Sequence, residues 1–293
     1  MRDGGGVLEY ASRRMSVMVL IYGSMRMRGK FTNAYLHRSM IAVLQFGLLG
    51  VWNTPVMAEG PLVLANGEWP PFFSEQLPHG GYGSRVCKAA FLLAGFDVEY
   101  EFLPWKRGYV GVVRGDYAGS PGWAKTAGRE ETFFYSDPIL TEATYFYHRK
   151  DDVRPGSNDI DLKGRVVGLT SGYLTRDIIE PHVTASGGRI SNAMTDVSNL
   201  KMLANGRIDI FPCSEKVFNF LAAEHLSPKE RAQLVRPVEP FFVEHYYLIM
   251  SRTLPNAQII IERFNTALRQ LRESGLLDKF WKEALLYRRL PSL

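Results

Sequence analysis

The stretch with the clearest capacity for chemistry is residues 119–138, GSPGWAKTAGREETFFYSDP, which ends a short strand, makes a turn and presents an arginine among apolar and aromatic residues. The guanidinium of this residue, Arg129, keeps its charge and offers a planar fork of donors that matches a carboxylate. A lone arginine is usually a solvated surface residue. The aromatic setting favours instead a cleft that binds a small carboxylate.

The composition is that of a globular protein. The chain has 293 residues, of which 46% are hydrophobic and 22% charged, and this length suffices for two lobes with separate cores. The net charge of +5 arises in residues 1–58, and the remainder holds 28 basic and 28 acidic side chains. Because the body of the chain is neutral, we expect no nucleic-acid partner.

Residues 1–58 are predicted to be an export signal with an upstream extension. Basic residues precede an apolar run at residues 40–52, which is too short to span a bilayer as a helix. We expect cleavage after Ala58 and release into the periplasm, with an uncleaved anchor as the alternative. Cys87 and Cys213 both follow this point, so no cysteine is placed to take a lipid. We expect them to be two separate buried thiols, although export permits a disulfide.

Strand and helix patterns alternate along the chain, which predicts βαβ units and mostly parallel sheets. One series begins with the buried run 62–65 and a second with Val166–Thr170. Two long extended segments, residues 141–150 and 241–250, connect the two series. We therefore expect two lobes, a double-stranded hinge and a cleft between the lobes.

Helix boundaries are predicted from capping residues, prolines and glycines. Proline and glycine bound a helix over Trp105–Arg114. In the second series, Ser171 and Gly172 are expected to cap one helix, and Asp196 is expected to be the N-cap of another. The last forty residues are amphipathic, with apolar residues at helical spacing. These apolar positions are Ala257, Ile260, Ile261, Phe264, Ala267, Leu268 and Leu271.

Four motifs in order resemble the family 3 bacterial solute-binding proteins, the periplasmic type that binds polar amino acids. They are LVLANGEWPPF, the TxxR spacing with FYSDP, DLKGRVVGLTSG and NGRIDIFPCSE, and the resemblance spans residues 62–281. It implies the α/β, type II, Venus flytrap fold, in which each lobe is a mostly parallel sheet flanked by helices and two strands form the hinge. The expected lobes are residues 59–145 with 246–293, and residues 146–245.

The resemblance also implies a ligand site. In that family the arginine at the position of Arg129 holds the ligand carboxylate, and the aromatic residue at Trp69 stacks over the ligand. The loop after the first strand of lobe two supplies hydrogen-bond donors. The resulting predicted ligand-binding residues are Arg129, Trp69, Trp123, Thr170, Ser171, Gly172, Tyr173 and Ser214.

Three positions depart from the family pattern. Ser214 stands where many members have the aspartate that pairs with an ammonium group, and Gly122 and Ala124 replace two serines. An amino acid ligand would then lack its acidic partner, which typically costs about 2 to 5 kcal/mol. The missing carboxylate could come from another acid, the candidates being Glu68, Glu142 and Glu215. An anion without an amine, or an aromatic acid stacked between Trp69 and Trp123, suits these residues as well.

The predicted function is capture of a small carboxylate-bearing solute, an amino acid or related organic acid, for an ABC importer. One alternative is a ligand sensor or adaptor that docks on a membrane receptor. Another is a periplasmic hydro-lyase resembling cyclohexadienyl dehydratase, with the same three glutamates as conceivable acids. We expect a monomer without catalytic residues, cofactor or metal. Lys106 and Arg107 are expected to be solvated, and Trp105 to face the cleft.

Overall fold

The computed structural model describes residues 60–152 and 161–287. The described residues from Leu62 onward form one compact unit, whose fold is given below. The predicted export signal, residues 1–58, lies outside the described residues. Within the described residues, none of the helices is long and apolar enough to cross a membrane.

Three parallel strands start the sheet. β1 (Leu62–Asn66) lies between β2 (Val98–Phe102) and β3 (Gly119–Ala124). The connections are η1 (Pro78–Gly80), α2 (Tyr82–Ala94) and α3 (Trp105–Arg114), and β3 leads to α4 (Ala127–Glu130) and β4 (Phe133–Tyr135). The bounds of α3 agree with the prediction. The helix ends at Arg114 because Gly115 follows at φ +84°, a conformation that favours glycine.

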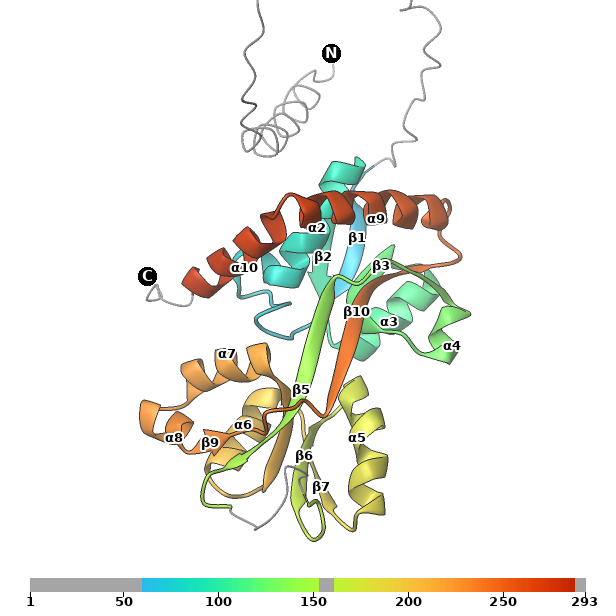
Figure 1. Ribbon diagram of the computed structural model, residues 1–293. Helices are drawn as coiled ribbons and strands as arrows, with labels where there is room; N and C mark the ends of the chain where they lie inside the picture. Colours follow the sequence, from blue (N-terminus) through green and yellow to red (C-terminus); the bar gives the residue numbers. More distant parts are fainter. Residues whose placement is uncertain (1–59, 153–160, 288–293) are drawn as a thin grey trace, which may run out of the picture. The chain divides into compact units, whose positions relative to one another are not determined.

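Two ten-residue strands hold the two halves of the sheet together. β5 (Leu140–Arg149) and β10 (Phe242–Ser251) are neighbours in the strand order β2-β1-β3-β10-β5-β8-β6-β7. The first half of β5 pairs with β10 and its second half with β8, while the second half of β10 pairs with β3. Figure 1 shows both strands running from the group around α2 and α9 to the group around α5 and α6. They are the predicted hinge segments.

The second half repeats the parallel pattern. β6 (Val166–Thr170) lies between β7 (Arg189–Ala193) and β8 (Ile210–Ser214), and the short β9 (Leu234–Val235) pairs with β5. The helices of this half are α5 (Leu174–Ala185), α6 (Asp196–Ala204), α7 (Glu215–His225) and α8 (Pro228–Ala232). Each half of the one mixed sheet has three parallel strands and flanking helices, and two long strands connect the halves. This arrangement confirms the predicted two-lobed α/β fold. The exact lobe boundaries stay a prediction.

The C-terminal amphipathic region forms α9 (Ala257–Glu273) and α10 (Leu276–Tyr287). All seven predicted apolar positions of α9 are buried. The helix packs on α2, where the rings of Phe91 and Phe264 lie 4.7 Å apart. Cys87 on α2 and Cys213 on β8 are both buried and unpaired, which confirms the expected free thiols.

Two predicted caps are wrong. Residue Tyr173, and not Ser171 or Gly172, is the N-cap of α5, and it makes no side-chain capping bond. In α6 the cap is Thr195, whose hydroxyl accepts a hydrogen bond from the backbone of Ser198. Asp196 is consequently the first residue of the helix, and its carboxylate is available for another contact.

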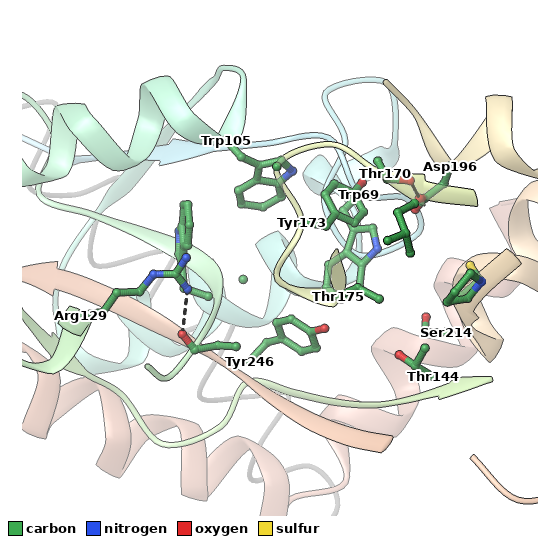
Figure 2. Close-up of a pocket in the computed structure, with 17 residues that line it drawn as sticks. Trp69, Trp105, Arg129, Thr144, Thr170, Tyr173, Thr175, Asp196, Ser214 and Tyr246 are labelled. Atoms are coloured by element: carbon green, nitrogen blue, oxygen red, sulfur yellow. Dashed lines mark hydrogen bonds between the residues drawn. The ribbon is translucent and has the colours of Figure 1, made fainter. Parts of the chain in front are cut away.

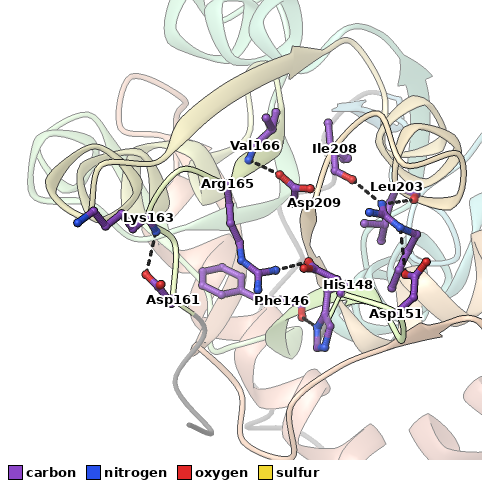
Figure 3. Close-up of polar contacts among 12 residues, drawn as sticks. Phe146, His148, Asp151, Asp161, Lys163, Arg165, Val166, Leu203, Ile208 and Asp209 are labelled. Carbon is purple, nitrogen blue, oxygen red and sulfur yellow. Dashed lines mark hydrogen bonds and ion pairs between the residues drawn. The ribbon is translucent and has the colours of Figure 1, made fainter. Parts of the chain in front are cut away.

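The far end of the second half carries a set of paired charges, Arg149, Asp152, Arg165 and Asp209, which we call the paired cluster. Arg165 is 5% exposed and forms an ion pair with Asp152. The Asp209 carboxylate accepts a hydrogen bond from the backbone of Val166 at 2.7 Å, as Figure 3 shows. Arg149 donates to two backbone carbonyl oxygens at 3.0 and 3.2 Å. These contacts fix the end of β5 against the segments around β6 and β8.

Candidate functional site

A cavity lies where the two halves of the sheet meet. Its walls come from the loop after β1, from β3 and α4, from β5 and β10, and from the starts of α5 and α6 (Figure 2). Its empty space amounts to about 820 Å³ when the part open to solvent is included. Seven of the eight predicted binding residues line it, namely Arg129, Trp69, Trp123, Thr170, Gly172, Tyr173 and Ser214. Ser171 is exposed and does not.

Arg129 stands on the short helix α4 at one side of the cavity. Its guanidinium lies 4.9 Å from the ring centre of Trp123 and 5.7 Å from that of Tyr109, and it donates to the carbonyl oxygen of Ala124 at 3.2 Å. Among the described residues no carboxylate forms an ion pair with it. The guanidinium covers one face of the Trp123 ring. That face is therefore not open to an aromatic ligand, contrary to the predicted stacking of an aromatic acid between Trp69 and Trp123.

The aromatic walls are held in place by their own contacts. The rings of Trp69 and Tyr246 lie 4.8 Å apart, and those of Trp105 and Trp123 meet edge to face at 5.7 Å. The indole nitrogen of Trp123 donates to the hydroxyl of Ser120 at 2.8 Å. Trp105 lines the cavity as expected. The rings are therefore oriented before any ligand arrives, which lowers the entropy cost of binding.

Packing explains why glycine replaces a serine at position 122. Gly122 has φ +89°, and a Cβ atom there would lie 2.9 Å from the ring of Phe73 and 3.1 Å from that of Trp105. A side chain at this position would have to displace one of the two rings. The missing serine hydroxyl is thus a consequence of the aromatic wall.

Asp196 lines the cavity, although from its sequence position it is expected only as a helix cap. Its carboxylate accepts a hydrogen bond from the hydroxyl of Thr170, which in turn accepts from the amide nitrogen of Asn199 at 2.9 Å. Burial raises the pKa of Asp196 to about 6, and the Thr170 hydrogen bond opposes this only in part. No lysine or arginine among the described residues forms an ion pair with it. The sequence signal that could have found it is Thr195, a second capping residue directly before it.

The three glutamates proposed from the sequence do not line the cavity. Glu142 is buried on β5 and pairs with Lys216. Burial raises the pKa of Glu142, although Lys216 and Ser214 lower it in part. Glu215 forms an ion pair with Arg236 at 2.7 Å, and Glu68 is exposed. The acid available to a ligand is therefore Asp196.

Ser214, the residue that replaces the expected aspartate, ends β8 and is the N-cap of α7. It is buried and lines the cavity together with Thr144, which pairs with it across β5 and β8. Besides Asp196 and Thr144, the lining residues that were not named from the sequence include Thr175 and Tyr246. These residues belong to elements far apart in the chain.

Other expectations concern residues away from the cavity. Lys106 and Arg107 are exposed and do not line it. None of the described histidines lines it either. Among residues 60–152 and 161–287, no group of three or more metal-ligating side chains is gathered in one place.

The chain is similar in sequence and in fold to several known proteins. No protein-family model matches the chain. The chain is 20% identical over 205 residues to the L-cystine-binding protein TcyA of Bacillus subtilis, covering 69% of this chain and 71% of that protein.

Two solved structures illustrate the likeness in fold. The amino acid ABC transporter substrate-binding protein AbpA of Streptococcus pneumoniae, bound to L-arginine, has a TM-score of 0.64 at 19% identity, covering 79% of this chain and 97% of that one. A histidine kinase sensor domain with similarity to periplasmic binding proteins has a TM-score of 0.63 at 19% identity, covering 77% of this chain and 96% of that one. The chain thus has the two-lobed fold of the periplasmic binding proteins, as its resemblance to them predicts.

Proposed function

We propose that this protein captures a small carboxylate-bearing solute, an amino acid or a related organic acid, in the cavity between its two lobes. The observation that carries the proposal is Arg129, a cation that has no acidic partner among the described residues and faces an aromatic cavity. A bidentate carboxylate is the partner its guanidinium suits best. The L-cystine and L-arginine bound by the two similar binding proteins both carry such a group.

Binding is coupled to closure of the two lobes in this proposal. Arg129 belongs to the half around β3, whereas Thr170 and Gly172 belong to the half around β6. A ligand that contacts both sides stabilises the closed arrangement relative to an open one, with β5 and β10 as the hinge. The closed form is then what a membrane partner recognises.

The test is a ligand screen by thermal shift over L-amino acids and organic acids, followed by the same screen on Arg129→Ala. We expect the variant to fold and to lose the ligand-induced stabilisation, since removing one partner of a charge pair costs about 2 to 5 kcal/mol of binding. Lys106→Ala removes an exposed cation outside the cavity and is the matched control, for which binding stays unchanged. Equal binding by Arg129→Ala and wild type would refute the proposal.

The partner is proposed to be the permease of an ABC importer, with the protein acting in the periplasm after removal of residues 1–58. A receptor-linked sensor is the second candidate, because a histidine kinase sensor domain has the same fold. The two candidates differ in what the closed form binds. Uptake of the radiolabelled ligand in cells with and without the gene separates them, since loss of uptake requires a transport role.

The hydro-lyase alternative now depends on Asp196, the acid that lines the cavity among the described residues. A pKa near 6 would suit a proton-transfer group. Incubating the purified protein with prephenate and arogenate and assaying for the elimination product tests it. We expect no turnover. Product formation that depends on Asp196 would replace the binding function with an enzymatic one.

A further inference from the structure

The cavity contains one positive and one negative side chain, and they are not paired with each other. Among the described residues that line it, Arg129 and Asp196 are the charged ones. In Figure 2 they lie on opposite sides of the view, with Trp69, Tyr173 and Tyr246 between them. A carboxylate that faces a largely aromatic cavity without a cation is costly unless something compensates it.

Capping does not account for Asp196. The backbone at the start of α6 is capped by Thr195, whose hydroxyl accepts from Ser198 at 3.2 Å. Asp196 gains a modest benefit from its place in the first turn, where the helix dipole favours negative charge. That benefit would be the same with the carboxylate in solvent, so it does not explain why the carboxylate faces the cavity.

The hydrogen bonds around Asp196 fix its orientation. Asn199 donates to Thr170, so the single hydroxyl hydrogen of Thr170 is committed to Asp196. One carboxylate oxygen, Oδ1, takes this bond, and no hydrogen bond from a described residue reaches the other. That oxygen remains available as an acceptor, and Asp196 lines the cavity in the lobe opposite Arg129.

The balance of charge limits the ligand. A ligand that pairs with both side chains carries one carboxylate and one cationic group. No other described lining residue is charged, so a third charge on the ligand would have no ion-pair partner. The rest of the lining is dominated by Trp69, Trp105, Tyr173 and Tyr246, whose rings favour an apolar or aromatic body. An extra guanidinium or carboxylate on the ligand would be buried without a partner.

We propose that Asp196, held by Thr170, takes over the role of ammonium partner that Ser214 cannot perform, and that the ligand is a neutral zwitterionic amino acid with an apolar or aromatic side chain. This inference rests on the proposed function, because Arg129 supplies the carboxylate site. The proposed ligand differs from L-arginine, the ligand of the similar S. pneumoniae protein. The reason is that the described cavity lining has no second acid to pair with a cationic side chain.

The experiment compares amino acids with their deamino analogues by calorimetry. The pairs are L-phenylalanine with 3-phenylpropionate, L-tryptophan with 3-(indol-3-yl)propionate, and L-leucine with 4-methylpentanoate, and L-arginine and L-glutamate are added as charged probes. We expect wild type to bind at least one amino acid about tenfold or more tightly than its analogue and than both charged probes. Asp196→Asn is expected to remove this preference by weakening the amino acid alone.

Controls separate the possible failures. Asp177→Asn, an exposed acid on α5 outside the cavity, is expected to keep the preference. If no probe binds wild type, this inference fails, while the proposed function is decided by the wider thermal-shift screen. If probes bind equally well to Arg129→Ala, the carboxylate site is wrong. If Arg129→Ala loses binding while Asp196→Asn keeps the preference for the amine, this inference alone is wrong.

A second measurement on wild type covers the case in which Asp196→Asn does not fold. Calorimetry at pH 6 in two buffers of different ionisation enthalpy gives the number of protons released on binding. Binding of the amino acid, with its ammonium group, is expected to release protons from Asp196, whereas binding of the deamino acid releases none. Tyr173, Cys213 and Tyr246 lie close to Asp196, and burial raises the pKa of each, so none of them titrates near pH 6. Equal proton release by both members of a pair would overturn the inference.

Discussion

Buried charge is treated in opposite ways in two regions of this protein. In the paired cluster, Arg165 meets Asp152 and Asp209 meets a backbone amide. In the cavity, Arg129 and Asp196 face the interior without an ion-pair partner among the described residues. In the paired cluster the charge of Arg165 is neutralised by Asp152, although its Nε has no hydrogen-bond partner among the described residues. In the cavity neither charge is neutralised. Charges held apart in this way cost stability and are available to a ligand.

The difference has a structural cause. The paired cluster joins segments of one lobe, so its charges meet as soon as that lobe folds. Arg129 and Asp196 are attached to different lobes, on α4 and α6, and aromatic rings lie between them (Figure 2). The comparison predicts that a mutation of the paired cluster reduces stability, while a mutation of the cavity charges reduces binding.

The largest stability effect is expected for Asp152→Asn. Its partner Arg165 has a side chain only 6% exposed, and leaving a buried charge uncompensated costs about 3 kcal/mol or more. Denaturant unfolding at pH 7 measures the loss. Asp151→Asn is the matched control, because Asp151 is 80% exposed and contacts Arg149 at 3.4 Å, and such surface pairs contribute about 1 kcal/mol or less. Equal losses would contradict the distinction between the two regions.

A smaller loss is expected for Gly122→Ser, which restores the serine of the family pattern. The positive φ and the contacts with Phe73 and Trp105 predict a destabilisation of about 1 to 3 kcal/mol. Ligand binding should also weaken, because Trp105 has to move. Gly128→Ser serves as control, since an added Cβ there meets nothing within 4 Å. A Gly122→Ser protein with wild-type stability and binding would show that the aromatic wall is not rigid.

The smallest expected change in stability is an increase. Asp196→Asn is expected to stabilise the empty protein at pH 7.5 by about 1 to 2 kcal/mol, since each pKa unit corresponds to about 1.4 kcal/mol and partial exposure screens the charge. The pKa of Asp196 rises from 3.8 to about 6 on folding, through burial.

The sign of the pH dependence follows from that shift. Between pH 4 and 6 the folded state binds the proton more tightly than the unfolded state, so wild type gains stability from this group as the pH falls. The advantage of Asp196→Asn is therefore expected to shrink at pH 4.5. Unfolding curves of both proteins at pH 4.5 and 7.5 measure it, and a variant less stable than wild type at pH 7.5 would show that the carboxylate has a partner in the empty protein.

Much of the fold could be predicted because its signals are local. Glycines at positive φ end α2 and α3, and the apolar stripe of α9 repeats at helical spacing. The strand β7 was missed, since its sequence RISNA has no apolar alternation and its side chains are mostly not buried. α4, the four-residue helix that carries Arg129, was also missed, because so short an element has little periodicity.

The sequence by itself determined the alternation of strands and helices, the two connecting segments and the aromatic setting of Arg129. These depend on the spacing of residues close together in the chain. Only the tertiary structure decided which acid faces the cavity. Thr195 and Asp196 are both good capping residues, and the choice between them depends on Thr170, which lies 26 positions away and reaches Asp196 through the pairing of β6 with β7. Contacts between distant segments also place Glu142 beside Lys216 and leave the cavity to Asp196.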